Sequence, residues 1–240
     1  MERKHKLVIF GGIFGLILAG GLIFYQEFIA VPKPPKITFD LSRHKKGILQ
    51  EFFKLCNWKG YKGELVRACN YSNPKVRNYA VQLAGTSSGE FNIGQVCNVF
   101  DHFYSNWKYV NDPPNQEYVA KASESIENNF NGDCDDFAVL MCASILAIGG
   151  EARLNFAHNS ESGHAFVEIN LGQTNINAII DYLTRRYRIH GSIWYRVDYQ
   201  GNNWLNLDWF ALHPGGKYFN FDAGTSFYPI QDFCQDFRKN

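Results

Sequence analysis

The chain lacks a charge excess of either sign. Its 240 residues carry 24 Lys and Arg against 23 Asp and Glu, a formal net charge of +1 at pH 7. A nucleic-acid-binding domain needs a basic surface that neutralises phosphates, and this balance offers none. We therefore expect no nucleic acid among the partners of this protein.

Metal-binding spacings are missing as well. The sequence has no Cys-x-x-Cys pair, no Cys/His spacing typical of a zinc site, and no loop of alternating acidic residues typical of calcium. We therefore expect neither a metal nor another cofactor. Internal repeats and low-complexity segments are also absent, and aromatic residues make up 16% of the chain. This composition is typical of one packed core and not of a disordered tail.

Cysteines are few, and their pattern leaves the redox compartment open. Cys134 and Cys142 fall in one apolar stretch with helical spacing, where we expect Cys142 to be buried. The other four could form up to two disulfides in an oxidising compartment, or remain buried thiols; they are Cys56, Cys69, Cys97 and Cys234.

One long apolar run is present at the start of the chain. Residues 7–25 carry no charge. A helix of this length is long enough to cross the roughly 30 Å hydrocarbon core of a bilayer. A signal peptide has a shorter apolar region and a small-x-small cleavage site, which residues 28–30 match poorly. We predict a short tail over 1–6 and an uncleaved transmembrane anchor over 7–29. Basic residues lie tighter against its first end, which favours an extracytoplasmic domain in a single-pass membrane protein.

Small residues repeat at every fourth position of the predicted anchor, at Gly11, Gly15 and Ala19. Such a stripe can pair membrane helices, although glycine is common in membrane spans in any case. A membrane-protein partner that binds through Gly11 and Gly15 is therefore one alternative, and the ordinary use of glycine in membrane helices is the other. The proline-rich residues 31–36 predict a stiff linker over 30–46, followed by one domain over 47–240.

Hydrophobic periodicity predicts an α+β domain in which helices precede strands. Helical patterns cover Gly47–Cys56, Pro74–Ala84 with Asn73 as its cap, Ile93–Trp107, Gln116–Phe130 and Cys134–Ile148. Alternating patterns cover Ala152–Phe156, Ala165–Ile169, Trp194–Tyr199 and Trp204–Asp208, the last two joined by a turn at 201–203. We expect the helix that begins at Cys134 to pack on an antiparallel sheet.

The position of Cys134 is typical of a nucleophile. A thiol in the first turn of a helix lies at the positive end of the helix dipole, which stabilises the thiolate. The neighbouring Asp133, Asp135 and Asp136 would oppose this effect if they faced the sulfur, or would cap the helix instead. The plainer alternative is that Cys134 is a small buried residue.

A histidine and an aspartate complete the pattern. His164 lies in an apolar alternating segment, and Asp208 lies between Leu207 and Trp209, where a buried carboxylate needs a partner. Each residue alone is weak evidence. Together they fit one arrangement, in which Asp208 orients His164 and His164 takes the proton of Cys134. Asp198 is the alternative carboxylate.

These segments resemble the transglutaminase-like superfamily of papain-like cysteine enzymes. The resemblance covers roughly Phe103 to Trp209 and rests on four blocks: residues 132–138, 146–153, 163–168 and 204–208. It implies a helix that carries the nucleophile Cys134 on an antiparallel sheet, with His164 as general base and acid and Asp208 fixing the imidazole. It also implies an oxyanion donor upstream of the nucleophile, for which Trp107 is the candidate. The sequence departs from the family by an insert over 173–192, with a predicted helix through 179–183.

The expected function is that of a membrane-anchored cysteine enzyme acting on amides of a protein or peptide substrate through a thioester. Proteolysis, deamidation and protein crosslinking share this intermediate, so the site residues do not distinguish them. The alternative is a catalytically silent transglutaminase-like domain that serves as a structural or assembly subunit of a membrane complex. The presence of all three site residues favours the enzyme.

Overall fold

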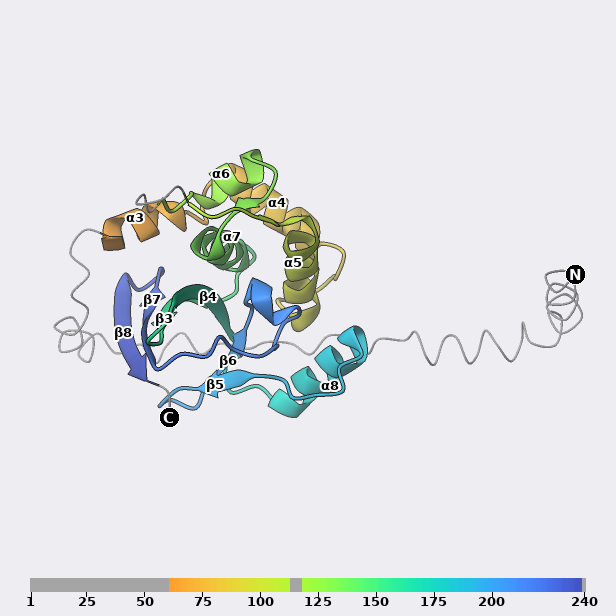
Figure 1. Cartoon of the computed structure of the whole chain (residues 1–240). Helices are drawn as coiled ribbons and strands as arrows, with labels where there is room; N and C mark the ends of the chain where they lie inside the picture. Colours follow the sequence, from red (N-terminus) through yellow and green to blue (C-terminus); the bar gives the residue numbers. More distant parts are fainter. Residues whose placement is uncertain (1–60, 113–117, 239–240) are drawn as a thin grey trace, which may run out of the picture. The chain divides into compact units, whose positions relative to one another are not determined.

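The computed structural model describes residues 61–112 and 118–238 (Figure 1). The helices are α3 (Tyr61–Ala68), α4 (Pro74–Ala84), α5 (Ile93–Asn106), α6 (Ala122–Glu127), α7 (Cys134–Ala147), α8 (Ile176–Tyr187) and the 3-10 helix η2 (Trp209–Ala211). The strands are β1 (Lys108–Tyr109), β2 (Asn131–Gly132), β3 (Ala152–His158), β4 (Gly163–Asn170), β5 (Tyr195–Val197), β6 (Asn203–Asn206), β7 (Ala223–Tyr228) and β8 (Phe233–Arg238).

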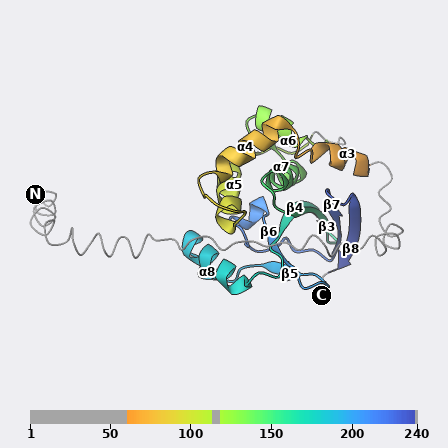
Figure 2. The ribbon, with the colours of Figure 1, turned by 180° about the vertical axis from the view of Figure 1, so that it is seen from behind.

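Six strands form one antiparallel sheet in the order β5-β6-β4-β3-β7-β8. Helix α7 lies between this sheet and the helices α4, α5 and α6, as Figures 1 and 2 show from opposite sides. Every residue of α7 from Asp135 to Leu146 is buried. A helix that is apolar on all sides needs such a central position, because no face of it is suited to water. The predicted α+β arrangement, with the Cys134 helix on an antiparallel sheet, is confirmed.

Local capping explains where the outer helices begin. The Asn73 side chain accepts a hydrogen bond from the Lys75 backbone N–H at 2.9 Å, and Pro74 fills the first helical position of α4. Asn92 caps α5 in the same way, and Gln95 returns a bond to the Asn92 backbone. The predicted helices over 74–84 and 93–107 are confirmed within a residue.

One predicted helix is wrong in extent. The pattern over Gln116–Phe130 predicts a long helix, but among the residues the structure describes only Ala122–Glu127 is helical there. Asn129 and Phe130 adopt left-handed backbone angles, with φ of 56° and 60°, which ends the helix and turns the chain toward β2. At the other end, the Ala120 backbone N–H is held by Asp136 at 2.6 Å and cannot join a helix.

The sheet is wider than the sequence pattern predicts. The four predicted strands correspond to β3, β4, β5 and β6, and the turn at 201–203 joins β5 to β6 as expected. Strands β7 and β8 are additional, and β7 lies against β3. Gly224 allows this close approach, because a Cβ there would lie 2.6 Å from the Phe156 backbone oxygen. The same glycine weakens the strand pattern of the segment.

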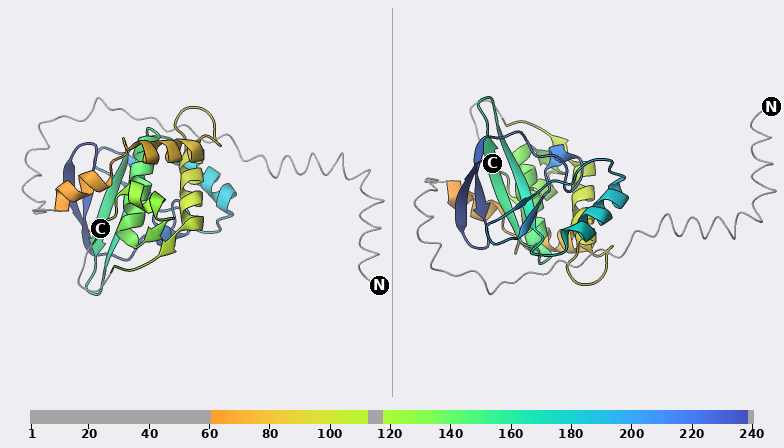
Figure 3. Two further views of the ribbon diagram at one scale, coloured as in Figure 1. Left: turned by 90° about the horizontal axis from the view of Figure 1, so that it is seen from above. Right: turned by 90° about the horizontal axis from the view of Figure 1, so that it is seen from below.

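The insert between β4 and β6 holds a helix, as predicted. Helix α8 lies beside α5, which the views from above and below in Figure 3 show. Arg186 Nη2 lies 2.7 Å from Asp101 Oδ2 on α5, and the Tyr187 hydroxyl donates to Asp101 Oδ1 at 2.7 Å. Ile179 and Leu183 of α8 are buried. The helix is thereby tied to the outer helical layer.

Several sequence predictions lie outside the described residues. These are the tail over 1–6, the anchor over 7–29 with its Gly11 and Gly15 stripe, the linker over 30–46 and the helix over 47–56. Within 61–112 and 118–238, no helix combines the length and the apolar character needed to cross a membrane.

Candidate active site

Cys134 is the first residue of α7, and a glycine fixes the approach of the chain to it. Gly132 has φ of +154°, and a Cβ at this position would lie 2.2 Å from the Asp136 carboxylate. That carboxylate accepts the Asp133 backbone N–H at 3.3 Å, so Asp136 caps the helix and does not serve the thiol. The cysteine is half-buried at the helix start, as predicted.

His164 and Asp208 form a close pair beside this helix start. His164 Nε2 lies 2.8 Å from Asp208 Oδ2, and the two side chains are only 7% and 4% exposed. The second carboxylate oxygen of Asp208 accepts the Phe210 backbone N–H at 3.1 Å, because Asp208 is also the cap of η2. The imidazole is therefore oriented by a carboxylate that is itself fixed.

The electrostatics of the pair favour a charged imidazole. Burial alone lowers the pKa of His164, but its hydrogen bonds to Asp208 and Cys134 outweigh burial and raise that pKa to about 9. Since Nε2 faces Asp208, Nδ1 is the ring nitrogen available to Cys134. Cys134, His164 and Asp208 line one small pocket, so the structure brings the three predicted site residues together.

Asp198, the alternative carboxylate, has a structural role in a turn. Asp198 accepts hydrogen bonds from the Trp204 indole at 3.0 Å and from the Gln200 and Asn202 backbone at 2.9 Å. These bonds organise the turn between β5 and β6. Asp208 and not Asp198 is therefore the carboxylate that contacts His164.

Trp107, the candidate oxyanion donor, lies beside Cys134. It follows α5, is 7% exposed, and presents its ring edge-on to Phe137 with centroids 5.2 Å apart. It lines the same pocket as Cys134 and His164. Its indole N–H is buried without a hydrogen-bond partner, which costs about 1–3 kcal/mol. Such a group is available to an oxygen that enters the pocket.

Tyr109 is a site residue that the sequence pattern did not reveal. Strand β1 pairs in parallel with β2, which sets Tyr109 opposite Gly132, and the ring stacks on Trp209 with centroids 5.7 Å apart. Burial, followed by the charges of Cys134 and Asp133, raises the pKa of Tyr109 to about 12, and its hydroxyl hydrogen-bonds to Cys134. A two-residue pairing carries too little periodicity to be found in the sequence.

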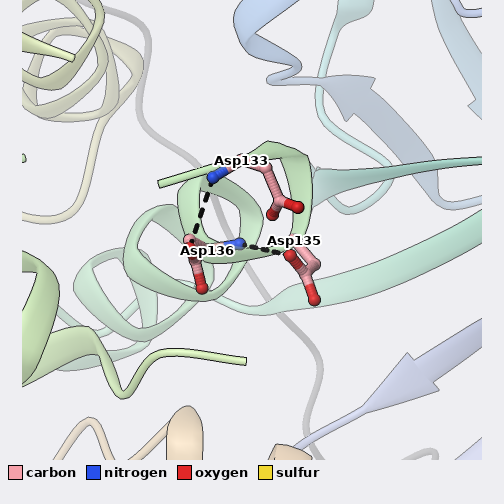
Figure 4. Close-up of side chains that lie close together, drawn as sticks. All are labelled: Asp133, Asp135 and Asp136. Atoms are coloured by element: carbon pink, nitrogen blue, oxygen red, sulfur yellow. Dashed lines mark hydrogen bonds between the residues drawn. The ribbon is translucent and has the colours of Figure 1, made fainter. Parts of the chain in front are cut away.

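Three carboxylates that neighbour Cys134 in the sequence lie close together (Figure 4). Ligand atoms of Asp133, Asp135 and Asp136 lie within 4.8 Å of one another, and in the described part of the chain they are the group that could hold a cation. Asp136 is occupied by two backbone N–H groups, and Asp135 accepts the Asp136 N–H at 3.0 Å. Burial and then the hydrogen bond and charge of Asp133 raise the pKa of Asp135. We assign no cation to this cluster.

An open cleft of about 870 Å³ borders Cys134 and His164. Its walls come from the start of α7, the β3–β4 hairpin and the β7–β8 pair. Its lining includes the ionisable side chains of Asp133, Asp135, Asp236 and Arg238. Helix α8 contributes no residue to this lining, so the insert does not cover the cleft.

A buried ionic network anchors β4 beyond His164. Glu168 is fully buried and meets Arg153 at 2.8 Å and Arg196 at 2.6 Å. The Tyr218 hydroxyl adds a further bond at 2.5 Å. Burial alone raises the pKa of Glu168, but the two guanidinium groups outweigh it and hold that pKa at about 2. The network joins β4 to β3, β5 and the segment before β7.

Three comparisons with known proteins were made, with the curated proteins, with the solved structures and with protein families. No curated protein matches the chain. Among solved structures, a candidate cysteine protease from Cytophaga hutchinsonii is 22% identical with a TM-score of 0.36, covering 48% of this chain and 40% of that one. A candidate protease from Parabacteroides distasonis is 15% identical with a TM-score of 0.34, covering 45% and 24%. Calcium-bound LapG from Legionella pneumophila is 16% identical with a TM-score of 0.36, covering 62% and 72%.

The family assignment comes from the sequence profile. This chain spans less than half the length of the first two of these structures, and such distant likenesses carry no argument about activity. The profile described as Transglutaminase-like superfamily matches residues 77–209, which is more than half of the chain and includes Cys134, His164 and Asp208. The chain belongs to the transglutaminase-like superfamily.

Proposed function

We propose that this protein is a membrane-anchored cysteine enzyme that breaks amide bonds of a protein or peptide substrate through a thioester. The observation that carries the proposal is the buried His164–Asp208 pair, 2.8 Å apart, next to a cysteine at the start of a buried helix. A thiol, a base and an orienting carboxylate in one pocket are the parts of an activated nucleophile.

In the first half of the reaction, the charged imidazole of His164 already holds the proton of the Cys134 thiol, and the thiolate sulfur attacks the substrate carbonyl carbon. The carbonyl oxygen becomes an oxyanion. When the tetrahedral intermediate collapses, the C–N bond breaks, His164 gives its proton to the leaving nitrogen, and a thioester remains on Cys134. Asp208 holds the imidazole in the required orientation throughout.

In the second half, water or a second amine attacks the thioester carbonyl carbon and gives a proton to His164. The C–S bond then breaks and the sulfur of Cys134 leaves as a thiolate, which restores the starting pair. Water gives hydrolysis, and an amine gives a new amide. The oxyanion is held by the Cys134 backbone N–H at the helix start and by the indole N–H of Trp107. The unpaired state of that N–H supports this role.

The setting of the enzyme is part of the proposal. The uncharged residues 7–25 support an anchor, and the placement of basic residues favours an extracytoplasmic domain. Cys234 is disulfide-bonded, which suits an oxidising compartment. A cleft of about 870 Å³ beside Cys134 and His164 suits a polypeptide segment as substrate.

The test compares two thiols on the same helix. In full-length protein in detergent, we expect iodoacetamide at neutral pH to modify Cys134 at least tenfold faster than the buried Cys142, measured by peptide mass spectrometry. Candidate protein substrates incubated with wild type and with Cys134→Ala should then differ by cleavage, by a deamidation mass shift or by crosslinks. Equal and slow labelling of both thiols would contradict the enzyme and support the silent structural domain.

A further inference from the structure

Two buried indole N–H groups at the candidate site have no hydrogen-bond partner. They belong to Trp107 and Trp209. Over the residues that the structure describes, these are the only buried side-chain nitrogens without an acceptor, and the other unpaired atoms are oxygens. Buried N–H groups are almost always paired, so two orphans in one place need an explanation.

The two indoles reach one pocket from separate elements. Trp107 follows α5, whereas Trp209 opens η2 immediately after Asp208. Both line the small pocket that also contains Cys134, His164 and Asp208. Trp209 is held by stacking on Tyr109, with centroids 5.7 Å apart and ring planes 23° apart. Both rings are therefore placed before any substrate binds.

Water does not explain the unpaired N–H groups. The pocket has no room for a water-sized sphere, so it is dry in this conformation. Two of its lining rings are partly exposed: Tyr109 at 38% and Phe210 at 55%. They contact each other with centroids 5.6 Å apart, and Phe210 also meets the His164 ring at 5.2 Å. A movement of these exposed rings would admit an acceptor from a substrate.

We propose that the indole N–H of Trp209 is a second side-chain donor to the acyl oxygen, acting with Trp107 and the Cys134 backbone N–H. This inference rests on the proposed function and names a further catalytic residue for it. The carbonyl oxygen gains negative charge as the sulfur attacks, and fixed donors in a dry pocket stabilise that charge most effectively. Asp208 and Trp209 are neighbours in the sequence and have different roles. Asp208 orients His164, and Trp209 donates a hydrogen bond to the acyl oxygen.

The experiment uses two small probes of the same thiol. p-Nitrophenyl acetate acylates Cys134 through an oxyanion and releases p-nitrophenol. Iodoacetamide alkylates the same sulfur by displacing iodide, without an oxyanion. Both rate constants are measured on full-length protein in detergent, by the mass of the Cys134 peptide, with Cys134→Ala as background. The ratio of acylation to alkylation isolates oxyanion stabilisation, because thiolate reactivity affects both rates.

We expect Trp209→Phe to lower the acylation rate by at least about tenfold and to change the alkylation rate less than twofold. Trp107→Phe should lower the same ratio. The matched control is Trp194→Phe, whose ring is 42% exposed and lies outside the pocket lining; it should change neither rate. Should Trp209→Phe fold poorly, benzothienylalanine at position 209 keeps the ring shape and replaces the N–H by sulfur.

The outcomes separate the two proposals. An unchanged ratio, or an equal loss of both rates, in a folded Trp209 variant would overturn the role of Trp209 while the enzyme stands. Wild-type Cys134 that reacts with both probes no faster than a free cysteine peptide would instead overturn the proposed function, and the role of Trp209 with it.

Discussion

At the scale of single residues, the imidazole of His164 links the site to the stability of the fold. Its pKa is raised to about 9, and an unperturbed histidine has a value near 6.5. The folded state therefore binds the proton more tightly than the unfolded chain does. This stabilisation is complete below about pH 6.5 and disappears as the pH rises through 9.

We predict that His164→Gln narrows the pH dependence of stability. The difference in the free energy of unfolding between wild type and variant should be larger at pH 6 than at pH 10. We expect this difference to shrink by about 3 kcal/mol between the two pH values. Denaturant unfolding of the full-length protein in detergent at a series of pH values measures this difference. Asp208→Asn, which removes the largest favourable contact of the imidazole, should flatten the same profile. A difference in unfolding free energy between wild type and variant that grows with pH would contradict the raised pKa of His164.

Residues differ in how far the sequence predicts them. Cys134, His164 and Asp208 stand out because each is a polar group in an apolar segment, and local chemistry then requires partners. The contacts of Tyr109 and the unpaired N–H of Trp209 could not be predicted, since both depend on which distant segments meet. Nothing in the sequence near Tyr109 specifies a parallel pairing with Gly132.

At the scale of elements, β4 is the best-secured strand in the site. It carries His164 near one end and the fully buried Glu168 further along, where two guanidinium groups converge. Removing one member of such a network leaves the others charged and unpaired in a low-dielectric interior. The strand that carries His164 is thus fixed by electrostatics as well as by backbone pairing.

We predict that Glu168→Gln costs about 3 kcal/mol in the free energy of unfolding, because Arg153 and Arg196 lose their counterion. The matched control is Glu161→Gln in the exposed β3–β4 turn, which should stay within about 0.5 kcal/mol of wild type. Chemical denaturation of both variants makes the comparison. A loss of less than about 1 kcal/mol for Glu168→Gln would show that the network is stabilised by other contacts.

Prediction of elements succeeded where one pattern ran long enough to identify the element. The buried α7 and the strands β3 and β4 carry their own periodicity and were found. The prediction of a helix over 116–130 is wrong in extent because Asn129 and Phe130 adopt left-handed backbone angles, which lead the chain into β2. This constraint comes from the tertiary structure and leaves no periodic pattern in the sequence. Strand β7 was missed because a glycine required by the neighbouring β3 interrupts its pattern.

At the scale of the whole molecule, the proposed anchor decides which substrates the site can meet. A domain tethered through a short proline-rich linker is confined near the membrane surface. Substrates would then be proteins that share that surface, or segments of membrane proteins exposed close to it. Such confinement raises the local concentration of substrate without any new contact at the site.

We predict that the full-length protein fractionates with membranes and resists extraction at alkaline pH, because residues 7–25 are 19 uncharged residues, a length sufficient for a helix to cross the bilayer core. Deletion of residues 7–29 should release the protein to the soluble fraction. Immunoblots of fractionated cells measure both. A full-length protein found in the soluble fraction would contradict the anchor while leaving the active-site proposal intact.

The placement of β7 beside β3 has a consequence for how the protein matures. Cys134, His164 and Asp208 are all synthesised before residue 209, whereas one wall of the cleft comes from β7 and β8. Until those strands pair, β3 presents an open edge and the thiol lies in a half-built groove. Pairing of distant strands is a slow event in folding. The substrate cleft is therefore complete only after β7 and β8 have been synthesised and have paired, later than the synthesis of Cys134, His164 and Asp208.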